Sequence, residues 1–285
     1  MLNDQTRHEI VVINPDVEVR FYLSEDEGSF VTPHWHNSLE MVYVIEGSIE
    51  VTCENYRRLV KPGEFILINS RNIHSVLSIK NKALVLQIPK EMLERFIPEI
   101  EMYYFEVDMN PVKETEKTRL KRVKEIFMDM YVVYDIRPEG YLLKFNSLLY
   151  DLLYYLRHSY SERLGKRQID KKNKYLAHIT EVMEHIKRHY KEPLHIPDIA
   201  KKFGYHPDYL ARIFRRYMGM TIVDYLYAVR IQHVYRELMD TDKFINQILD
   251  ENGCQNYRVA MRVFKEKYGC TPKEKRIQIK KTNSE

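Results

Sequence analysis

Four side chains in the N-terminal third of the sequence could together bind a metal ion or a small polar ligand. His34 and His36 are two residues apart, so on a strand both would point to the same face, and Glu40 follows four residues later. His74 follows a second short apolar run, Phe65–Ile68. Three imidazoles and one carboxylate are a plausible ligand set for a divalent transition metal. The pattern therefore predicts a metal centre or a polar pocket in which the histidines bind one another or a ligand.

The same stretch contains aromatic residues that a small-molecule site would use. Pockets for small molecules combine apolar walls with a few polar groups. Trp35 is the only tryptophan and lies between two of the histidines. Stacking on this ring would suit a sugar, which favours a carbohydrate effector, although a core or surface tryptophan is equally common. The expected ligand site consists of His34, Trp35, His36, Glu40, Tyr43 and His74.

Two patterns in the C-terminal half are typical of a helix-turn-helix. In the first, residues 196–217, Ala200 is small where two helices must cross, and Gly204 permits the left-handed backbone of a tight turn. Pro207 then opens the next helix at a position where its missing N–H costs little. Residues off the apolar stripe of that helix could meet a major groove. They are Asp208, Ala211, Arg212, Arg215 and Arg216.

The second pattern, residues 245–268, repeats this arrangement around Gly253. Its candidate DNA-contacting residues are Tyr257, Arg258, Met261, Arg262 and Lys265. Thr221 is expected to cap a helix over residues 221–239 that joins the two units. Arginine suits the guanine edge, which predicts base contacts for Arg212, Arg258 and Arg262. Phosphate contacts are expected from Arg215, Arg216, Lys265 and Lys267.

A plain helical bundle is the alternative interpretation of either pattern alone. Two units in tandem, joined by one capped helix and carrying five arginines on their outer faces, favour a DNA-binding domain instead. An RNA-binding or architectural role is a further alternative. A recognition helix suits the major groove of B-form DNA, whereas the deep, narrow groove of A-form RNA excludes it.

The elements around these residues predict an α+β protein of several domains. Short β-rich runs punctuated by turn signals fill residues 10–88 and indicate a barrel, assigned with its flanks to 1–108. Helical periodicity follows in 109–160, a segment expected either to pair two subunits or to be an ordinary buried helical layer. The polar, basic stretch 161–174 is interpreted as a linker. Residues 175–279 are expected to form an all-α DNA-binding domain.

Composition narrows the class of protein. The net charge of +4 over 285 residues is uneven, since residues 170–285 carry 23 Lys and Arg against 15 Asp and Glu. This excess suggests that the C-terminal half faces a polyanion. Three widely spaced cysteines indicate no disulfide framework, which fits a reducing cytoplasm. The polar residues 1–9 do not resemble a signal peptide, and no apolar run is long enough for a membrane span.

The C-terminal motifs resemble those of the AraC/XylS family of bacterial regulators over residues 175–276. The matching positions are Ile199, Ala200, Gly204, Leu210, Phe214, Gly219, Tyr225, Leu226, Arg230, Ile231, Leu238, Gly253, Arg262, Phe264, Lys265, Gly269, Thr271, Pro272 and Arg276. The resemblance implies two helix-turn-helix subdomains whose recognition helices enter adjacent major-groove segments. Leu249, Cys254, Ala260 and Val234 depart from the usual residues. The changes at Cys254 and Ala260 remove aromatic volume from the second subdomain's core, and Leu249 is expected to refill part of it. The second subdomain is therefore expected to be looser or to dock its recognition helix differently.

The N-terminal motif, from Gly28 to Gly47 with Gly63 and His74 beyond it, resembles the cupin superfamily of jelly-roll barrels. Asn69 and Arg71 stand where that superfamily usually has Pro and Gly. Together the two resemblances imply a non-enzymatic transcription regulator, a homodimer that binds double-stranded DNA and contacts RNA polymerase as an activator under control of a small-molecule effector. The alternative is a metal-dependent cupin enzyme, a dioxygenase or an isomerase, fused to a DNA-binding module.

Overall fold

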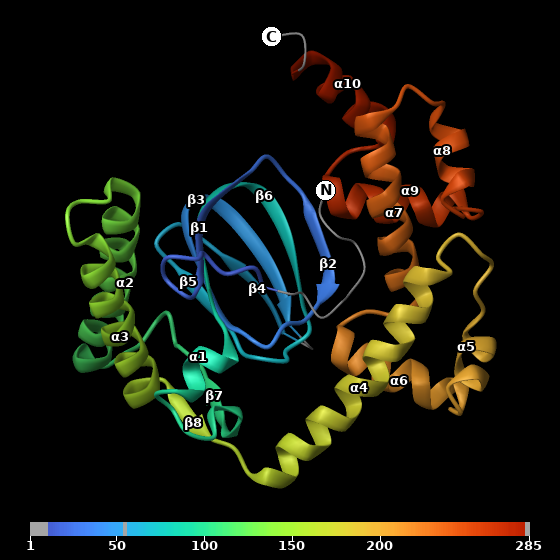
Figure 1. Ribbon diagram of the computed structural model, residues 1–285. Coiled ribbons are helices and arrows are strands. Elements are labelled where there is room, and N and C mark those ends of the chain that lie inside the picture. Colours follow the sequence, from blue (N-terminus) through green and yellow to red (C-terminus); the bar gives the residue numbers. More distant parts are fainter. Residues whose placement is uncertain (1–10, 54–55, 283–285) are drawn as a thin grey trace.

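The computed structural model describes residues 11–53 and 56–282. Residues 1–9, which are not expected to form a signal peptide, lie outside the described residues. A β-barrel occupies the centre of the molecule, with a helical layer on one side and a separate helical domain on the other (Figure 1). This arrangement confirms the predicted fold class of a cupin-like barrel with helices, followed by an all-α domain. Within the described residues, no helix is both long and apolar enough to cross a membrane.

The barrel is built from two long strands and four shorter ones, all paired antiparallel. The strands are β1 (Arg20–Asp26), β2 (Phe30–His34), β3 (Leu39–Cys53), β4 (Tyr56–Val60), β5 (Phe65–Ile68) and β6 (His74–Ile88). The register pairs β3 with β6 along their whole length, from Leu39 opposite Ile88 to Cys53 opposite His74. A register shift beside Gly47 bends β3, and a Cβ at Gly47 would lie only 1.9 Å from the carbonyl oxygen of Lys80. Only glycine fits this crossing of the two strands.

Alternation along β3 assigns its side chains to two separate cores. Val42 and Val44 point into the barrel, where they form one cluster with Ile66, Ile68 and Val85. Leu39 and Met41 belong to a second cluster that lies between the barrel and the neighbouring helices. Since Glu40 shares the parity of Val42, its carboxylate points into the barrel.

The helical layer packs against the outer face of the barrel. It comprises α1 (Lys90–Glu94), the 3-10 helix η1 (Ile100–Met102), α2 (Glu114–Ile136) and α3 (Tyr141–Ser159). Phe21 of the barrel meets Phe127 of α2 edge-on at 5.8 Å and Phe145 of α3 at 5.3 Å. These contacts fix the helix pair on the sheet and leave one face of α3 exposed.

Residues 161–174, expected to form a linker, are ordered into secondary structure instead. Strand β8 (Ser161–Arg163) pairs with β7 (Tyr103–Phe105), and the long helix α4 (Lys166–Arg188) begins soon after. The side chain of Gln168 accepts a hydrogen bond from the backbone N–H of Gly165 at 3.0 Å, which caps the helix. This segment is therefore polar because it forms the exposed first turns of α4 and not because it is a flexible linker.

The C-terminal domain contains two helix-turn-helix units joined by one long helix. After α4 come α5 (Ile196–Lys202), α6 (Pro207–Met218), α7 (Ile222–Asp240), α8 (Ile245–Glu251), α9 (Tyr257–Tyr268) and α10 (Pro272–Thr282). The predicted cap of the long helix is present, because Thr221 accepts a hydrogen bond from the backbone N–H of Asp224 at 3.1 Å. In the second unit Leu249, Cys254 and Ala260 are all at most 1% exposed. All three side chains therefore lie in the core of that unit.

Candidate nucleic-acid interface and barrel site

Helix α6 separates a buried face from a charged face. Leu210, Ile213 and Phe214 lie in the core of the first unit, at the i, i+3 and i+4 spacing of one helical stripe. The opposite face exposes the predicted residues Asp208, Arg212, Arg215 and Arg216, with Ala211 half-buried between them. Pro207 begins the helix and Gly219 ends it in a left-handed conformation. The structure thus brings all five predicted residues of this helix together on one side.

Helix α9 presents a similar charged face with more internal pairing. Tyr257, Arg258, Arg262 and Lys265 are exposed and Met261 is half-buried. Arg262 forms ion pairs with Asp224 at 3.2 Å and with Glu266 at 2.9 Å. The hydroxyl of Tyr257 donates to Asp250 at 2.6 Å. These contacts hold two candidate DNA-contacting side chains, Arg262 and Tyr257, in defined positions.

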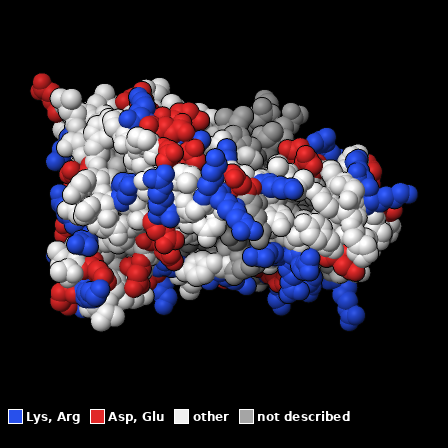
Figure 2. Space-filling view, turned by 90° about the horizontal axis from the view of Figure 1, so that it is seen from below, with Lys and Arg blue, Asp and Glu red and all other residues white. Residues whose placement is uncertain are grey.

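When the molecule is seen from below, Lys and Arg are more prominent than Asp and Glu over the helical domain, among mainly uncharged residues (Figure 2). The barrel and helical layer mix both signs in the same view. This distribution agrees with the charge excess of the C-terminal sequence and suits a polyanionic partner.

A cluster of three histidines and one glutamate lies within the barrel. One ligand atom from each of His34, His36 and His74 lies within 4.8 Å of the others. The Nε2 of His36 donates to the Glu40 carboxylate at 2.6 Å, and the Nε2 of His74 lies 3.7 Å from the same oxygen. The predicted set of four residues is therefore brought together by the end of β2, the loop that follows it, the start of β3 and the start of β6.

Backbone carbonyls orient all three imidazole rings. The Nδ1 atoms of His34, His36 and His74 contact the carbonyl oxygens of Thr32, Ser38 and Asn72 at 3.0, 3.1 and 3.0 Å. An Nδ1–H that donates to a carbonyl leaves Nε2 as the ligand atom. This is the ring orientation that metal-binding histidines require.

The electrostatics of the cluster favour an ionised carboxylate beside a neutral His74. Burial by itself would raise the pKa of Glu40, but the hydrogen bond from His36 and the neighbouring imidazole charges outweigh it and lower that pKa to about 2. Burial lowers the pKa of His74 to about 3, and the charge of His34 adds to the effect. A carboxylate and converging imidazole nitrogens fit a divalent transition metal such as Zn²⁺. A metal bound there would take the place of the proton between His36 and Glu40.

Two of the predicted ligand-site residues lie away from this cluster. Trp35 packs on the helical domain, where its indole N–H donates to Thr180 of α4 at 3.0 Å. Tyr43 points to the outer face of the barrel and lies 6.1 Å from the ring of Phe127. Both differences follow from strand alternation, which turns neighbours of inward-facing residues outward.

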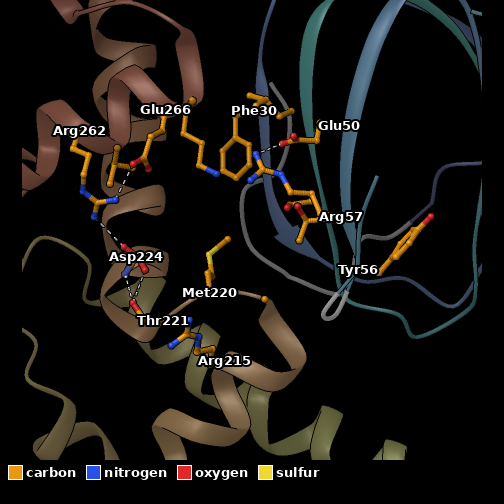
Figure 3. Close-up of a pocket in the computed structure, with 16 residues that line it drawn as sticks. Phe30, Glu50, Tyr56, Arg57, Arg215, Met220, Thr221, Asp224, Arg262 and Glu266 are labelled. Carbon is orange, nitrogen blue, oxygen red and sulfur yellow. Dashed lines mark hydrogen bonds and ion pairs between the residues drawn. The ribbon is translucent and has the colours of Figure 1, made fainter. Parts of the chain in front are cut away.

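A cavity of about 610 Å³ lies between the barrel and the helical domain (Figure 3). Its walls include Phe30 and Arg57 from the barrel and Arg215, Met220 and Arg262 from the helical domain. Lys267 also lines this cavity, and its ammonium group lies 3.7 Å from the centre of the Phe30 ring. Burial lowers the pKa of Lys267 to about 8.

The contact between Phe30 and Lys267 was not predicted from the sequence. The two residues are 237 positions apart, and neither belongs to a motif of the other domain. Lys267, expected to contact phosphate, is held by the barrel in this structure.

Comparison with known proteins finds two family matches in this chain. A family described as a cupin domain matches residues 21–88, and one described as a helix-turn-helix domain matches residues 199–278. An uncharacterized HTH-type transcriptional regulator of Staphylococcus aureus (strain COL) is 24% identical over 250 residues. That alignment covers 84% of this chain but only 31% of the relative, so the chain spans about a third of that relative's length.

Solved structures also resemble the chain. A transcriptional regulator from Chromobacterium violaceum, described as containing an AraC-type DNA-binding domain, is 26% identical. The match covers 38% of this chain and 96% of the chain from Chromobacterium violaceum, with a TM-score of 0.34. ToxT from Vibrio cholerae is 14% identical, and the match covers 91% of this chain and 97% of the ToxT chain with a TM-score of 0.41.

Proposed function

Because the chain joins a cupin domain to an AraC-type helix-turn-helix domain, we propose that it regulates transcription by binding specific DNA sequences under the control of a small molecule. The two family matches confirm the resemblance inferred from the motifs. The observation that carries the proposal is the pair of recognition helices, α6 and α9, each with a packed apolar face and an exposed face rich in arginine.

Base reading and phosphate binding are assigned to different side chains. Arg212, Arg258 and Arg262 are exposed on the recognition helices and are proposed to contact guanine edges. For this contact Arg262 must first give up its ion pairs with Asp224 and Glu266. Phosphate contacts go to Arg215, Arg216 and Lys265, which are exposed nearer the C-terminal ends of the same helices. The partner is double-stranded DNA, since a helix of this kind fits the major groove of the B form.

The experiment that tests this function is selection of binding sites from a randomised DNA duplex library by the full chain. The enriched site is then titrated against random duplex at several salt concentrations. Specific binding should exceed random binding by at least about 10³-fold and weaken steeply with salt. Equal affinity for enriched and random duplexes at every salt concentration would refute sequence-specific regulation.

The proposed binding site of the effector is the histidine cluster and the barrel interior around it. A carbohydrate remains the first candidate, although Trp35, whose ring suggested it, lies at the domain boundary. We expect a ligand that changes the position of His34 or His36 to move Trp35, which lies between them in sequence and bonds to α4. Ligand binding would thereby change the position of the helical domain relative to the barrel. The expected result is activation of transcription through RNA polymerase.

Release of α9 from the barrel should strengthen DNA binding. Replacing Phe30 by Ala removes the ring beneath Lys267 and frees that ammonium group for a phosphate. Since a cation–π contact contributes about 0.5–2 kcal/mol, we expect the affinity for DNA to rise between about 2-fold and 30-fold. The measurement is titration of labelled duplex with the full chain. Tyr56→Ala, at another aromatic residue lining the cavity, is the control, and an unchanged affinity for Phe30→Ala would contradict this route of control.

A homodimer through α3 is proposed from the exposed face of that helix. Leu143 is 82% exposed, and Tyr150 and Tyr154 follow at 44% and 62% on the same helical stripe. The ring of Phe96 lies 5.0 Å from that of Tyr150 and extends the apolar surface. An apolar stripe of this length is typical of a subunit interface.

Introducing a charge at Leu143 should therefore separate the subunits. For Leu143→Asp we expect sedimentation velocity to report a monomer at concentrations where the wild-type chain is a dimer. Lys121→Asp, on the exposed surface of α2, should leave the dimer intact. A dimer that persists in Leu143→Asp would exclude this face of α3 as the interface.

A further inference from the structure

The loop between α4 and α5, residues 189–195, contacts both helix-turn-helix units. Arg230 of α7 is only 5% exposed and points its guanidinium group at this loop. Its Nε donates to the carbonyl oxygen of Tyr190 at 2.7 Å, and a terminal nitrogen donates to that of Glu192 at 2.8 Å. Two charge-assisted hydrogen bonds from one planar group fix both the position and the angle of the loop on the joining helix.

The turn of the second unit packs against the same loop. Gly253 has a φ of +71°, and a Cβ on it would lie 2.6 Å from the carbonyl oxygen of Lys191. The turn glycine thus serves two purposes, since it permits the left-handed backbone and allows the loop to approach. The second unit therefore packs against the loop 189–195, which precedes the first unit, in addition to its connection to α7.

Tyr190 completes the junction between the units. Its ring stacks on His233 of α7 with centroids 4.2 Å apart and planes 7° from parallel. Its hydroxyl lies 3.5 Å from Asn252, which is fully buried beside Gly253. The side chain of Asn252 in turn donates to Glu237 of α7 at 2.9 Å. Contacts from Arg230, His233 and Gly253 hold the loop at three separate points.

We propose that Arg230, through the loop that it holds, sets the separation of two DNA half-sites. Here the half-sites are the two DNA segments that α6 and α9 of one chain contact. With the loop clamped, α9 cannot rotate about α7 relative to α6, so the two recognition helices meet DNA at one separation and one angle. Arg230 and Gly253 are positioning residues in this scheme, because neither is exposed on the charged face of a recognition helix. The inference rests on the proposed function, since it concerns how that DNA site is read.

DNA geometry makes the proposal measurable. One turn of B-form DNA contains about 10–10.5 base pairs over 34–36 Å, so each inserted base pair moves one half-site by roughly 3.4 Å and turns it by about 35°. A rigid pair of recognition helices cannot follow a change of two base pairs. A pair free to swing about α7 can follow it in part.

The test uses the full chain and the site enriched from a randomised duplex library. Duplexes with one or two base pairs inserted between the half-sites are titrated against wild type and Arg230→Gln. For wild type we expect the two-base-pair insertion to weaken binding at least tenfold. For Arg230→Gln we expect the loss to shrink below about threefold. Arg236→Gln removes an exposed arginine of the same helix and should retain the wild-type loss.

A second, milder variant separates loss of positioning from loss of folding. His233→Ala removes only the ring stacked on Tyr190 and should reduce the spacing penalty in the same direction as Arg230→Gln. Thermal unfolding of both variants establishes that the domain is folded during the titrations. If either folded variant keeps the full wild-type penalty, Arg230 and its loop do not set the spacing. If wild type enriches no site at all, the proposed function fails, which is a different result.

Discussion

Arg212→Ala is expected to lower the affinity of the full chain for its enriched DNA site by between about 5-fold and 150-fold. The side chain is exposed on the charged face of α6 and lies over Tyr209, with its guanidinium carbon 5.7 Å from that ring. A bidentate contact with guanine contributes about 1–3 kcal/mol of discrimination, which sets the size of the effect. Titration of the enriched duplex and of duplexes with each base pair replaced measures it.

The pattern across those duplexes distinguishes base reading from phosphate binding. If Arg212 reads a base, the variant loses preference at one position and changes little on random DNA. A uniform loss on all duplexes would reassign Arg212 to the phosphates. Arg122→Ala, at a half-buried position of α2, controls for the loss of one positive charge far from the recognition helices.

His74→Ala is expected to abolish metal binding by the barrel. His74 is 1% exposed and its Nδ1 is oriented by the carbonyl oxygen of Asn72, so no neighbouring residue can take over its Nε2. Loss of residues that merely orient a ligand costs 10–100-fold in metal affinity, and loss of a ligand should cost at least about as much. The wild-type chain, titrated with Co²⁺ and followed by its visible absorption, should bind one equivalent.

The control for this experiment is a histidine outside the barrel. His158→Ala, at the end of α3, should bind Co²⁺ as tightly as wild type. If the wild-type chain binds no Co²⁺ and no Zn²⁺, the cluster is a polar pocket in which His36 and Glu40 pair directly. The proposed effector site would then stand without a metal.

Local patterns predicted the parts of these sites that lie close together in the sequence. The two-residue spacing of His34 and His36 correctly placed both rings on one face, because a strand has a period of two. The same period explains the failure at Trp35 and Tyr43, whose types suited a ligand pocket but whose parity directs them outward.

Contacts between distant elements could not be predicted in this way. Phe30 and Lys267 meet only because the barrel packs on α9, and neither residue belongs to a pattern that names the other. Arg230 was recognised as part of a family motif, but its bonds to Tyr190 and Glu192 depend on how a loop folds back on α7. Such contacts depend on tertiary packing, which one sequence does not specify by periodicity.

The position of Trp35 gives the protein an optical probe of its own. Because the chain has no second tryptophan, all indole emission comes from a ring at the boundary between barrel and helical domain, bonded to Thr180. Separation of the domains would expose that ring to water and shift its emission to the red. Opening and closing can therefore be followed in real time in the unlabelled wild-type protein.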